Sequence, residues 1–223
     1  MLNLPKSTQV DKLVPKERFY TKESSKTKRF FINLIDKVIW ANKISPTTLN
    51  ISTQTYPELQ IFEVRIKSVD NVINKVILLI DSKIPYPVLF LLHFEDKMKA
   101  ILSIKQVTNE KTVILEQFET DWQDIEQLKL DLKGNSVDTI YENYLYQINS
   151  EFPLGGNFED RIVKYKQIKS IKKEITKINH KMNTEPSLSK KQALARYRNT
   201  LEKKINEVDA QLSIPTRAFT PFW

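Results

Sequence analysis

The stretch Ile84–Lys105, IPYPVLFLLHFEDKMKAILSIK, decides the fold because it encodes two consecutive strands in the middle of the chain. Two prolines lead into Val88–Glu95, a nearly continuous apolar run that predicts a buried central strand. The polar triplet Glu95-Asp96-Lys97 predicts a hairpin turn into a second strand, Met98–Val107. We therefore expect an antiparallel hairpin at the core of the molecule.

The segments on either side of this hairpin complete a small domain. Glu58–Lys67 (ELQIFEVRIK) alternates apolar and charged residues, as a half-buried strand does. In chain order we predict a helix over Lys26–Lys43, strands over Thr48–Thr53 and Glu58–Lys67, a helix capped by Ser68 or Asp70 that ends near Lys83, the two hairpin strands, a strand over Lys111–Phe118, a polar helix or turn over Trp122–Lys133, and a helix capped by Ser136. The order β-β-α-β-β-β favours an α+β fold, with a small mixed or antiparallel sheet and flanking helices, over a doubly wound fold.

A different pattern begins after the Gly-containing segment 153–157. Two apolar stripes with heptad-like spacing follow, separated by a proline loop: Ile168, Ile171, Ile175, Ile178 and Met182, then Leu194, Tyr197, Leu201, Ile205, Val208 and Leu212. They predict a C-terminal antiparallel helical hairpin, coiled-coil-like, with an oligomer through it as one option. The expected organisation is an extended arm (1–25), an α+β domain (26–152), a basic helical hairpin (158–212) and an aromatic tail (213–223).

The scarce residue types exclude several kinds of site. Cysteine is absent, which excludes disulfides, thiolate nucleophiles and cysteine-ligated metals. The three glycines cannot form either phosphate-binding glycine fingerprint, and two histidines are too few for a His-rich metal site. We interpret His93, inside the apolar run, as a packing residue or a general base, and His180, among lysines, as a surface residue. No cofactor and no metal is expected.

The apolar segments are too short for a membrane location. The N-terminus lacks the apolar core of a signal peptide, and the apolar run of the central hairpin falls short of the roughly 20 residues that a membrane span needs. We therefore expect a soluble, cytoplasmic protein.

The net charge of +8 is distributed unevenly, with 35 Lys+Arg against 27 Asp+Glu. Residues 1–29 carry eight basic and three acidic residues, residues 30–157 carry 12 and 17, and residues 158–212 carry 14 and seven. An acidic middle between two basic ends is typical of a protein that contacts a polyanion or an acidic partner, although a solvated lysine-rich face has the same composition.

Several segments together resemble a bacterial family that is catalogued as a domain of unknown function, number 4391. They are LPKSTQVDKLVPKERFY (Leu4–Tyr20), IDKVIWANKISPTTLNI (Ile35–Ile51), the strand ELQIFEVRIK, the central stretch and the basic hairpin. Where members usually end the hairpin with an Ala-Tyr-Lys-like triplet, this chain has Ser103-Ile104-Lys105. Genes of this family commonly sit beside helicases and DNA methyltransferases in restriction-type defence clusters. The resemblance therefore implies an accessory role in an antiviral DNA-targeting complex, with those enzymes as partners.

That setting makes a metal-dependent nuclease the sharpest enzymatic hypothesis. Such a site needs carboxylates around Mg²⁺ and a lysine beside the attacked phosphate, and the candidates are Glu58, Glu63 and Lys67. The usual acidic-x-Lys strand ending is missing, because Glu63 is followed by Arg65 at that spacing. The alternative is an exposed strand face on which these charges screen one another, and we favour a non-catalytic role over a nuclease.

The basic hairpin and the tail are the preferred binding segments. The hairpin residues expected to contact DNA or RNA are Lys164, Lys169, Lys172, Lys173, Lys177, Lys181, Lys190, Lys191, Arg196 and Arg198. Phe219, Phe222 and Trp223 either anchor a partner or pack on their own domain. The predicted function is an accessory or scaffolding subunit of a bacterial defence complex that binds nucleic acid, a helicase or a methyltransferase. A Mg²⁺-dependent nuclease subunit and a purely structural coiled-coil adaptor are the alternatives.

Overall fold

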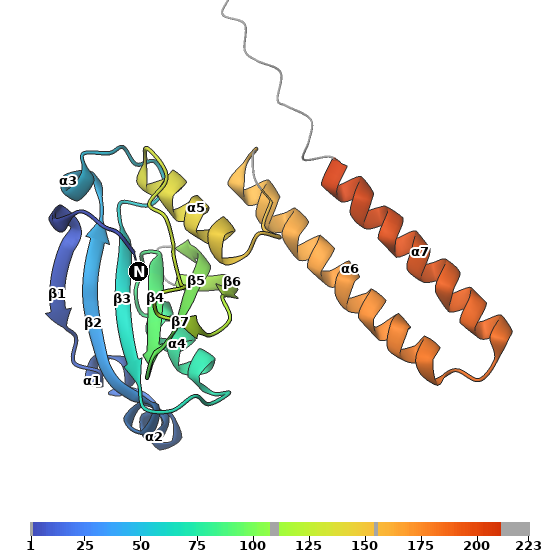
Figure 1. Ribbon diagram of the computed structural model, residues 1–223, viewed down its shortest axis with the longest axis horizontal. Coiled ribbons are helices and arrows are strands. Elements are labelled where there is room, and N and C mark those ends of the chain that lie inside the picture. The colour runs from blue at the N-terminus through green and yellow to red at the C-terminus, as the bar shows by residue number, and fades with distance from the viewer. Residues whose placement is uncertain (1, 108–111, 154–155, 211–223) are drawn as a thin grey trace, which may run out of the picture. The chain divides into compact units, whose positions relative to one another are not determined.

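The chain divides into two units in the computed structural model, a sheet unit (Met1–Ser150) and a hairpin unit (Glu151–Trp223) (Figure 1). The structure describes residues 2–107, 112–153 and 156–210. The break between the units lies just before the segment 153–157, where the composition of the sequence changes.

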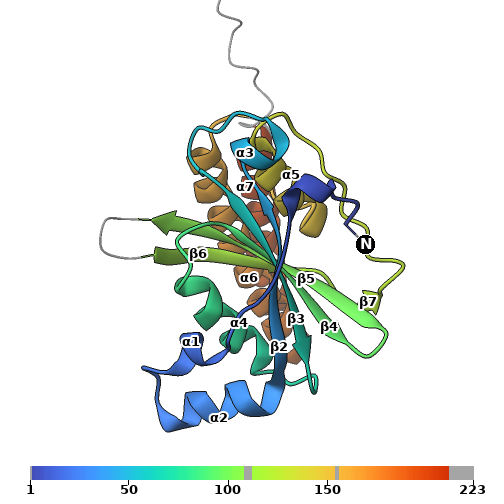
Figure 2. The same ribbon diagram turned by 90° about the vertical axis from the view of Figure 1, so that its left-hand side faces the viewer.

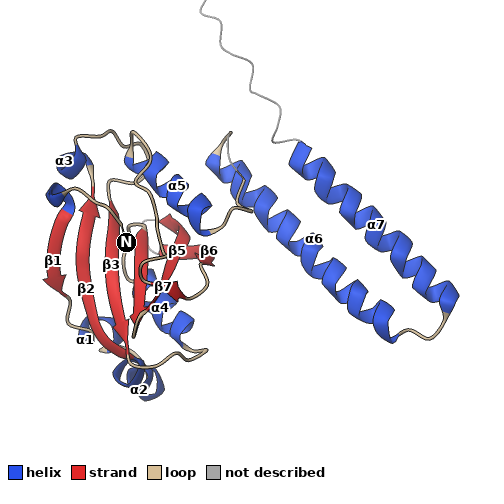
Figure 3. Cartoon of the chain, viewed as in Figure 1, coloured by secondary structure: helices blue, strands red, loops and turns tan. Residues whose placement is uncertain are grey.

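A mixed sheet forms the sheet unit, and its six main strands lie side by side in chain order (Figure 3). They are β1 (Gln9–Leu13), β2 (Ile35–Ile44), β3 (Leu59–Ile66), β4 (Val88–Phe94), β5 (Lys97–Val107) and β6 (Thr112–Glu119), and the short β7 (Gln123–Asp124) pairs with β5. Neighbouring strands are antiparallel, except for the parallel pair β3 and β4. The predicted α+β class with a mixed, mostly antiparallel sheet is confirmed.

Helices on one side of the sheet build the main apolar cluster. The crossover between the parallel strands contains α4 (Ile73–Ser82), which buries Ile77 and Ile80 against sheet residues such as Phe90. Helices α1 (Glu17–Tyr20) and α2 (Ser25–Leu34) add further side chains to the same cluster. Two parallel strands need a crossover connection of this kind. The apolar side of α4 covers the buried strand β4, so the crossover also closes this part of the core.

Helix α5 (Val137–Ile148) covers the other side of the sheet (Figure 2). It begins at Ser136, whose Oγ accepts a hydrogen bond from the backbone N–H of Thr139 at 3.1 Å, as predicted for a capping serine. Its Tyr141 is buried, and the hydroxyl donates to the carbonyl of Ser103 on β5 at 2.9 Å. The centre of β5 is therefore enclosed from both sides.

Two predicted elements of the sheet unit are wrong, and one of two alternatives is excluded for a third. The predicted helix over 26–43 ends at Leu34, and the chain continues as β2. The strand predicted over 48–53 does not form: its first two residues belong to α3 (Pro46–Leu49), which Ser45 opens with a capping box, and Ser52 forms only an isolated bridge with Ser136. Of the alternatives for residues 122–133, the helix is wrong, because β7 is followed by turn residues at 125–127. The segment expected to be an extended arm also contains a short 3₁₀ turn (Lys6–Thr8), β1 and α1.

The hairpin unit consists of α6 (Phe158–Thr184) and α7 (Leu188–Ala210). Asn157 caps α6 by accepting hydrogen bonds from the backbone N–H groups of Glu159 and Asp160 at 2.7 and 3.4 Å. The helices join along an apolar seam made of Ile171, Ile178 and Leu201, with Ile175, Met182, Leu194 and Ile205 packed against them. The predicted helical hairpin is confirmed. Within the ranges that the structure describes, no helix has both the length and the apolar character that a membrane crossing requires.

Candidate functional site

Four lysines form a continuous basic face along α6. Lys166, Lys169, Lys173 and Lys177 follow one another at spacings of three, four and four residues, which places them on one side of a helix. Lys173 follows the seam residue Ile171 by two positions, which turns it by about 200° around the helix axis. The basic face of α6, meaning these four lysines, therefore points away from α7.

The basic face lacks the acidic residues that normally alternate with lysine on a solvated helix. Between Lys164 and Lys181 the chain has seven lysines and one acidic residue, Glu174. The Oε1 atom of Glu174 accepts a hydrogen bond from the hydroxyl of Tyr197 on α7 at 2.8 Å, so this carboxylate is turned toward the partner helix. Lys173 and Lys177 are exposed, and the Nζ of Lys169 lies 5.8 Å from the centre of the Tyr165 ring.

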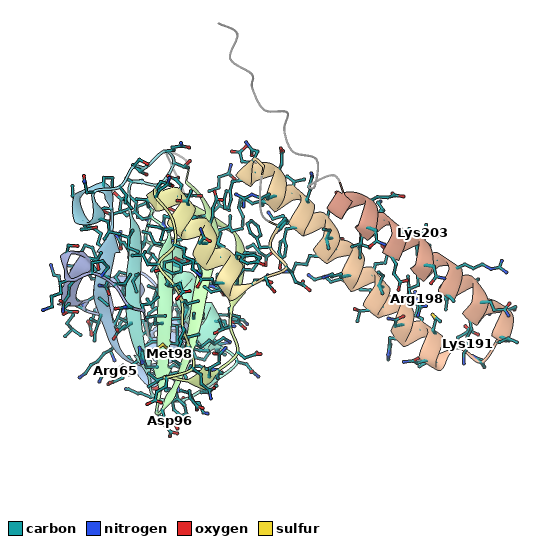
Figure 4. All side chains as sticks on the ribbon, turned by 45° about the horizontal axis from the view of Figure 1, so that its top comes forward. Arg65, Asp96, Met98, Lys191, Arg198 and Lys203 are labelled. Atoms are coloured by element: carbon teal, nitrogen blue, oxygen red, sulfur yellow. The ribbon has the colours of Figure 1, made fainter. Side chains whose placement is uncertain are left out.

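The remaining predicted nucleic-acid residues lie elsewhere on the hairpin (Figure 4). Lys172 is held in an ion pair, with its Nζ 2.7 Å from Oε1 of Glu151. Arg198 of α7 pairs with Glu202 one turn further on, at 3.4 Å. Lys164 is half-buried on α6, Lys191 is half-buried on α7, and Arg196 is exposed on α7. Lys181 and Lys190 flank a cavity of about 500 Å³ near the loop between the helices. The aromatic residues Phe219, Phe222 and Trp223 lie outside the described residues.

The three residues of the nuclease hypothesis are not brought together. Glu58 precedes β3 and accepts a hydrogen bond from Gln60 Nε2 at 2.5 Å. Glu63 lies in the middle of the same strand, and Lys67, just past its end, donates from Nζ to the carbonyl of Ile32 at 2.8 Å. Five residues of strand separate the two carboxylates by roughly 16 Å. Among the described residues, no three acidic or histidine side chains are grouped so that they could hold a metal ion.

Sequence reasoning missed the most enclosed charged group of the sheet unit, the pair Lys105 and Asp81. Lys105 Nζ lies 2.5 Å from Oδ1 of Asp81, and both side chains have no exposed surface. The same ammonium donates to the carbonyls of Asp81, Ile84 and Tyr86 at 2.9, 2.9 and 2.7 Å. Four oxygen atoms therefore surround a group with three N–H bonds, and no donor is left for a substrate.

Burial dominates the ionisation of this pair. It lowers the pKa of Lys105, and the Asp81 carboxylate opposes this change. It likewise raises the pKa of Asp81, against the charge of Lys105. The pair ties the end of α4 to β5. A signal was available in the sequence, because Asp81 interrupts the apolar side of its helix.

The two histidines differ in their surroundings. His93 lies on β4 with 19% of its side chain exposed, and its Nε2 is 3.9 Å from Oε2 of Glu63. Burial lowers the pKa of His93, Glu63 acts to raise it, and Arg65 acts to lower it further. His180 lies on α6 and is exposed, as expected.

The architecture defines a class of protein, an α+β sheet protein with an appended basic helical hairpin. In a comparison with protein families, the family described as "Domain of unknown function (DUF4391)" matches residues 2–212. The chain therefore belongs to this family. No curated protein and no solved structure matches it.

Proposed function

We propose that the protein binds nucleic acid through the basic face of α6. The observation that carries the proposal is the single sign of charge on a helix face that pairing with α7 does not use. Over their whole lengths α6 has eight basic and three acidic residues and α7 has six and three, but Glu159 and Asp160 lie in the first turn of α6 and Glu174 is turned toward α7. A nucleic-acid backbone would supply the negative charge that the basic face of α6 lacks.

The dimensions of the basic face suit a phosphate backbone. Lys166 and Lys177 are eleven residues apart, which is about 16 Å along a helix. DNA carries one charge per roughly 1.7 Å of its axis, so each lysine of the face meets a phosphate. Four such contacts give a slope of about −3.6 for the logarithm of affinity against that of salt concentration, and a loss of about 10²-fold between 50 and 200 mM salt.

Fluorescence anisotropy with labelled single- and double-stranded DNA tests this proposal on the full chain. The double charge reversal Lys173→Glu/Lys177→Glu should weaken binding at least tenfold and reduce the salt slope by about two. The control Lys203→Glu/Lys204→Glu makes the same change of charge on α7 and should weaken binding much less. An equal loss in both variants, or an affinity that does not depend on salt, would contradict a role for α6.

We further propose that the protein acts as an accessory subunit of a bacterial DNA-targeting defence complex. This role rests on the gene neighbourhood that the family resemblance implies, with a helicase or a DNA methyltransferase as the expected partner; the family match itself extends over residues 2–212. The test is co-expression with the neighbouring helicase or methyltransferase, after which the protein should co-elute with one of them. Separate elution of all three proteins at micromolar concentration would refute the subunit role and leave the DNA-binding test unaffected.

A further inference from the structure

Three nitrogen-bearing side chains form a row across adjacent strands of the sheet unit. Lys37 of β2 pairs with Arg65 of β3, and Arg65 pairs with His93 of β4. Directly paired residues point to the same face of a sheet. Their sequence neighbours Val38, Val64 and Leu92 point into the cluster beneath α4, so the row occupies the opposite face.

The row carries an uncompensated positive charge. Lys37 and Arg65 are exposed and directly opposite each other, an arrangement that destabilises a sheet. Neither forms an ion pair with any carboxylate in the described part of the chain. The Nε2 atom of His93 is buried and has no hydrogen-bond partner among the residues that the structure describes. An anion on this row would relieve the repulsion, accept hydrogen bonds from Lys37 and Arg65, and lie against the part of the His93 ring that is exposed.

A polar cavity adjoins the row at Glu63. This carboxylate lies 3.9 Å from His93 Nε2, and it also lines a cavity of about 240 Å³. The other polar residues of the cavity are Lys6, Gln9, Asp11 and Asn42. Carboxylate and amide oxygens accept hydrogen bonds from hydroxyl groups, so this cavity suits a ligand that carries several of them.

We propose that this surface binds a small phosphate ester of the sugar-phosphate class. Its phosphate group contacts Lys37, Arg65 and His93, and its hydroxyl groups enter the cavity beside Glu63. Arginine binds phosphate oxygens in a bidentate manner and lysine adds a point charge, so the two residues are suited to one tetrahedral anion. The site lies wholly within the sheet unit, so it does not depend on the nucleic-acid proposal for the hairpin.

Proton NMR of the histidine rings tests the anion part of the proposal in the full chain. The chain has two histidines, one in each unit, so His180 serves as an internal control. The ionisable groups that face His93 are Glu63 and Arg65, and its neighbour on β5 is the uncharged Met98. Sulfate, which does not titrate between pH 5 and 8, should raise the titration midpoint of His93 by about one unit, equal to tenfold tighter binding to the protonated ring.

Variants of the row decide whether this shift comes from the proposed site. Lys37→Gln and Arg65→Gln should abolish the sulfate-dependent shift, whereas Lys75→Gln, at an exposed position on α4, should leave it intact. Sodium chloride at equal ionic strength is the reference for each titration. An unchanged midpoint in sulfate, an equal shift of His180, or a full shift in Arg65→Gln would overturn the anion site.

Ribose 5-phosphate tests the class of ligand. It should shift the His93 resonance at a concentration at least tenfold lower than inorganic phosphate does, because its hydroxyl groups reach the cavity. Ribose alone should leave the resonance in place. Equal concentrations for ribose 5-phosphate and inorganic phosphate would overturn the role of the cavity.

Discussion

Replacing Lys105 by methionine tests what the buried ion pair contributes to the sheet unit. Methionine fills most of the space of the lysine chain and removes the charge. The substitution leaves Asp81, which has no exposed surface, without its cation. It also removes the donor to the carbonyls of Ile84 and Tyr86 in the loop after α4. The carbonyl of Asp81 keeps a second donor, the backbone N–H of Ile84 at 3.2 Å.

The expected loss of stability follows from the Asp81 carboxylate and the backbone carbonyls that stay buried without the lysine. Removing one partner of a buried pair costs about 3–5 kcal/mol, because the other charge is left uncompensated. Carbonyls that lose a donor add to this cost when water cannot reach them. We expect Lys105→Met to lower the free energy of unfolding by about 4 kcal/mol, a large fraction of the 5–15 kcal/mol typical of a domain.

Urea unfolding followed by tryptophan fluorescence measures this loss, since Trp40 and Trp122 both lie in the sheet unit. The matched control is Lys99→Met on the same strand, where the partner Glu119 is 37% exposed and the ion pair, 2.9 Å long, contributes within about 1 kcal/mol. The double variant Lys105→Met/Asp81→Leu removes both charges and should lose less than Lys105→Met alone. A loss in Lys105→Met no greater than in Lys99→Met would refute the reasoning, and so would a strictly additive double variant.

The pH dependence of the Lys105→Met variant has a definite sign. Without the ammonium, burial raises the pKa of Asp81 in the folded state above its unfolded value, and the opposing effect of Lys105 is gone. The folded variant then binds a proton more tightly than the unfolded chain does, so its stability rises as the pH falls through the raised pKa. The deficit relative to the parent should shrink between pH 8 and pH 5.

Four further substitutions test other parts of the structure. Asp138 accepts hydrogen bonds from the backbone N–H groups of residues 54–56; burial raises its pKa, but these bonds outweigh burial and lower it overall. Asp138→Ala should therefore cost about 1–2 kcal/mol at pH 7, and the cost should vanish as the pH falls below about 4 through the lowered pKa, which paired urea titrations would show. Gly134→Ala should lower the free energy of unfolding by about 2–4 kcal/mol, because Gly134 has φ +142° and an added Cβ would lie 2.6 Å from Thr139 Oγ1. Gly156→Ala should lower it by about 1 kcal/mol, because an added Cβ there meets open space. Thermal unfolding measures both losses. Ile178→Ala should destabilise the hairpin unit by about 2–3 kcal/mol, seen as faster proteolysis within α6. In a Trp223→Phe background, where Trp40 and Trp122 of the sheet unit supply the fluorescence, the unfolding transition should stay unchanged.

The helix predicted over 26–43 wrongly included β2, and this error has a specific cause in the register of the sheet. Along this strand Ile35, Val38, Ala41 and Ile44 are buried, a spacing of three that resembles one side of a helix. The spacing arises because the pairing with β3 shifts at two irregularities, between Ile35 and Lys37 and between Trp40 and Asn42. An extra residue at a bulge reverses the alternation of a strand. Periodicity alone therefore assigns this segment to the wrong class.

Elements with local signals were predicted well. Helix α5 begins at the predicted cap Ser136, and the helical hairpin follows the predicted apolar seam of α6 and α7. These features depend on residues three to seven positions apart, which a single sequence displays directly.

The strand predicted over 48–53, after Ser45, was wrong because a local hydrogen bond overrode the composition of the segment. Its threonines resemble a strand in composition, but the hydroxyl of Thr48 accepts a hydrogen bond from the backbone N–H of Ser45 at 2.9 Å, which is one half of the capping box.

The candidate sites also differ in how far the sequence alone predicts them. The basic face of α6 can be read from the spacing of its lysines, because one helix carries all of them. The row formed by Lys37, Arg65 and His93 cannot, because it needs the register of three strands that are far apart in the chain. The Lys105–Asp81 pair likewise joins a strand to a helix 24 residues earlier. Sequence patterns therefore reveal sites within one element and miss those that tertiary structure assembles.

The partners of the lysines separate charges that stabilise the fold from charges that remain for a ligand. In the sheet unit, Lys16 and Lys67 donate to backbone carbonyls at 2.9 and 2.8 Å, and so they hold α2 and β2 in place. The side chains of Lys166, Lys173 and Lys177 form neither a hydrogen bond nor an ion pair with another residue in the ranges that the structure describes. Lysines four residues apart on a helix repel each other, so the basic face costs the hairpin stability that its apolar seam must offset. A partner that supplies negative charge along this face would offset the repulsion, which is why we propose α6 as the nucleic-acid-binding element.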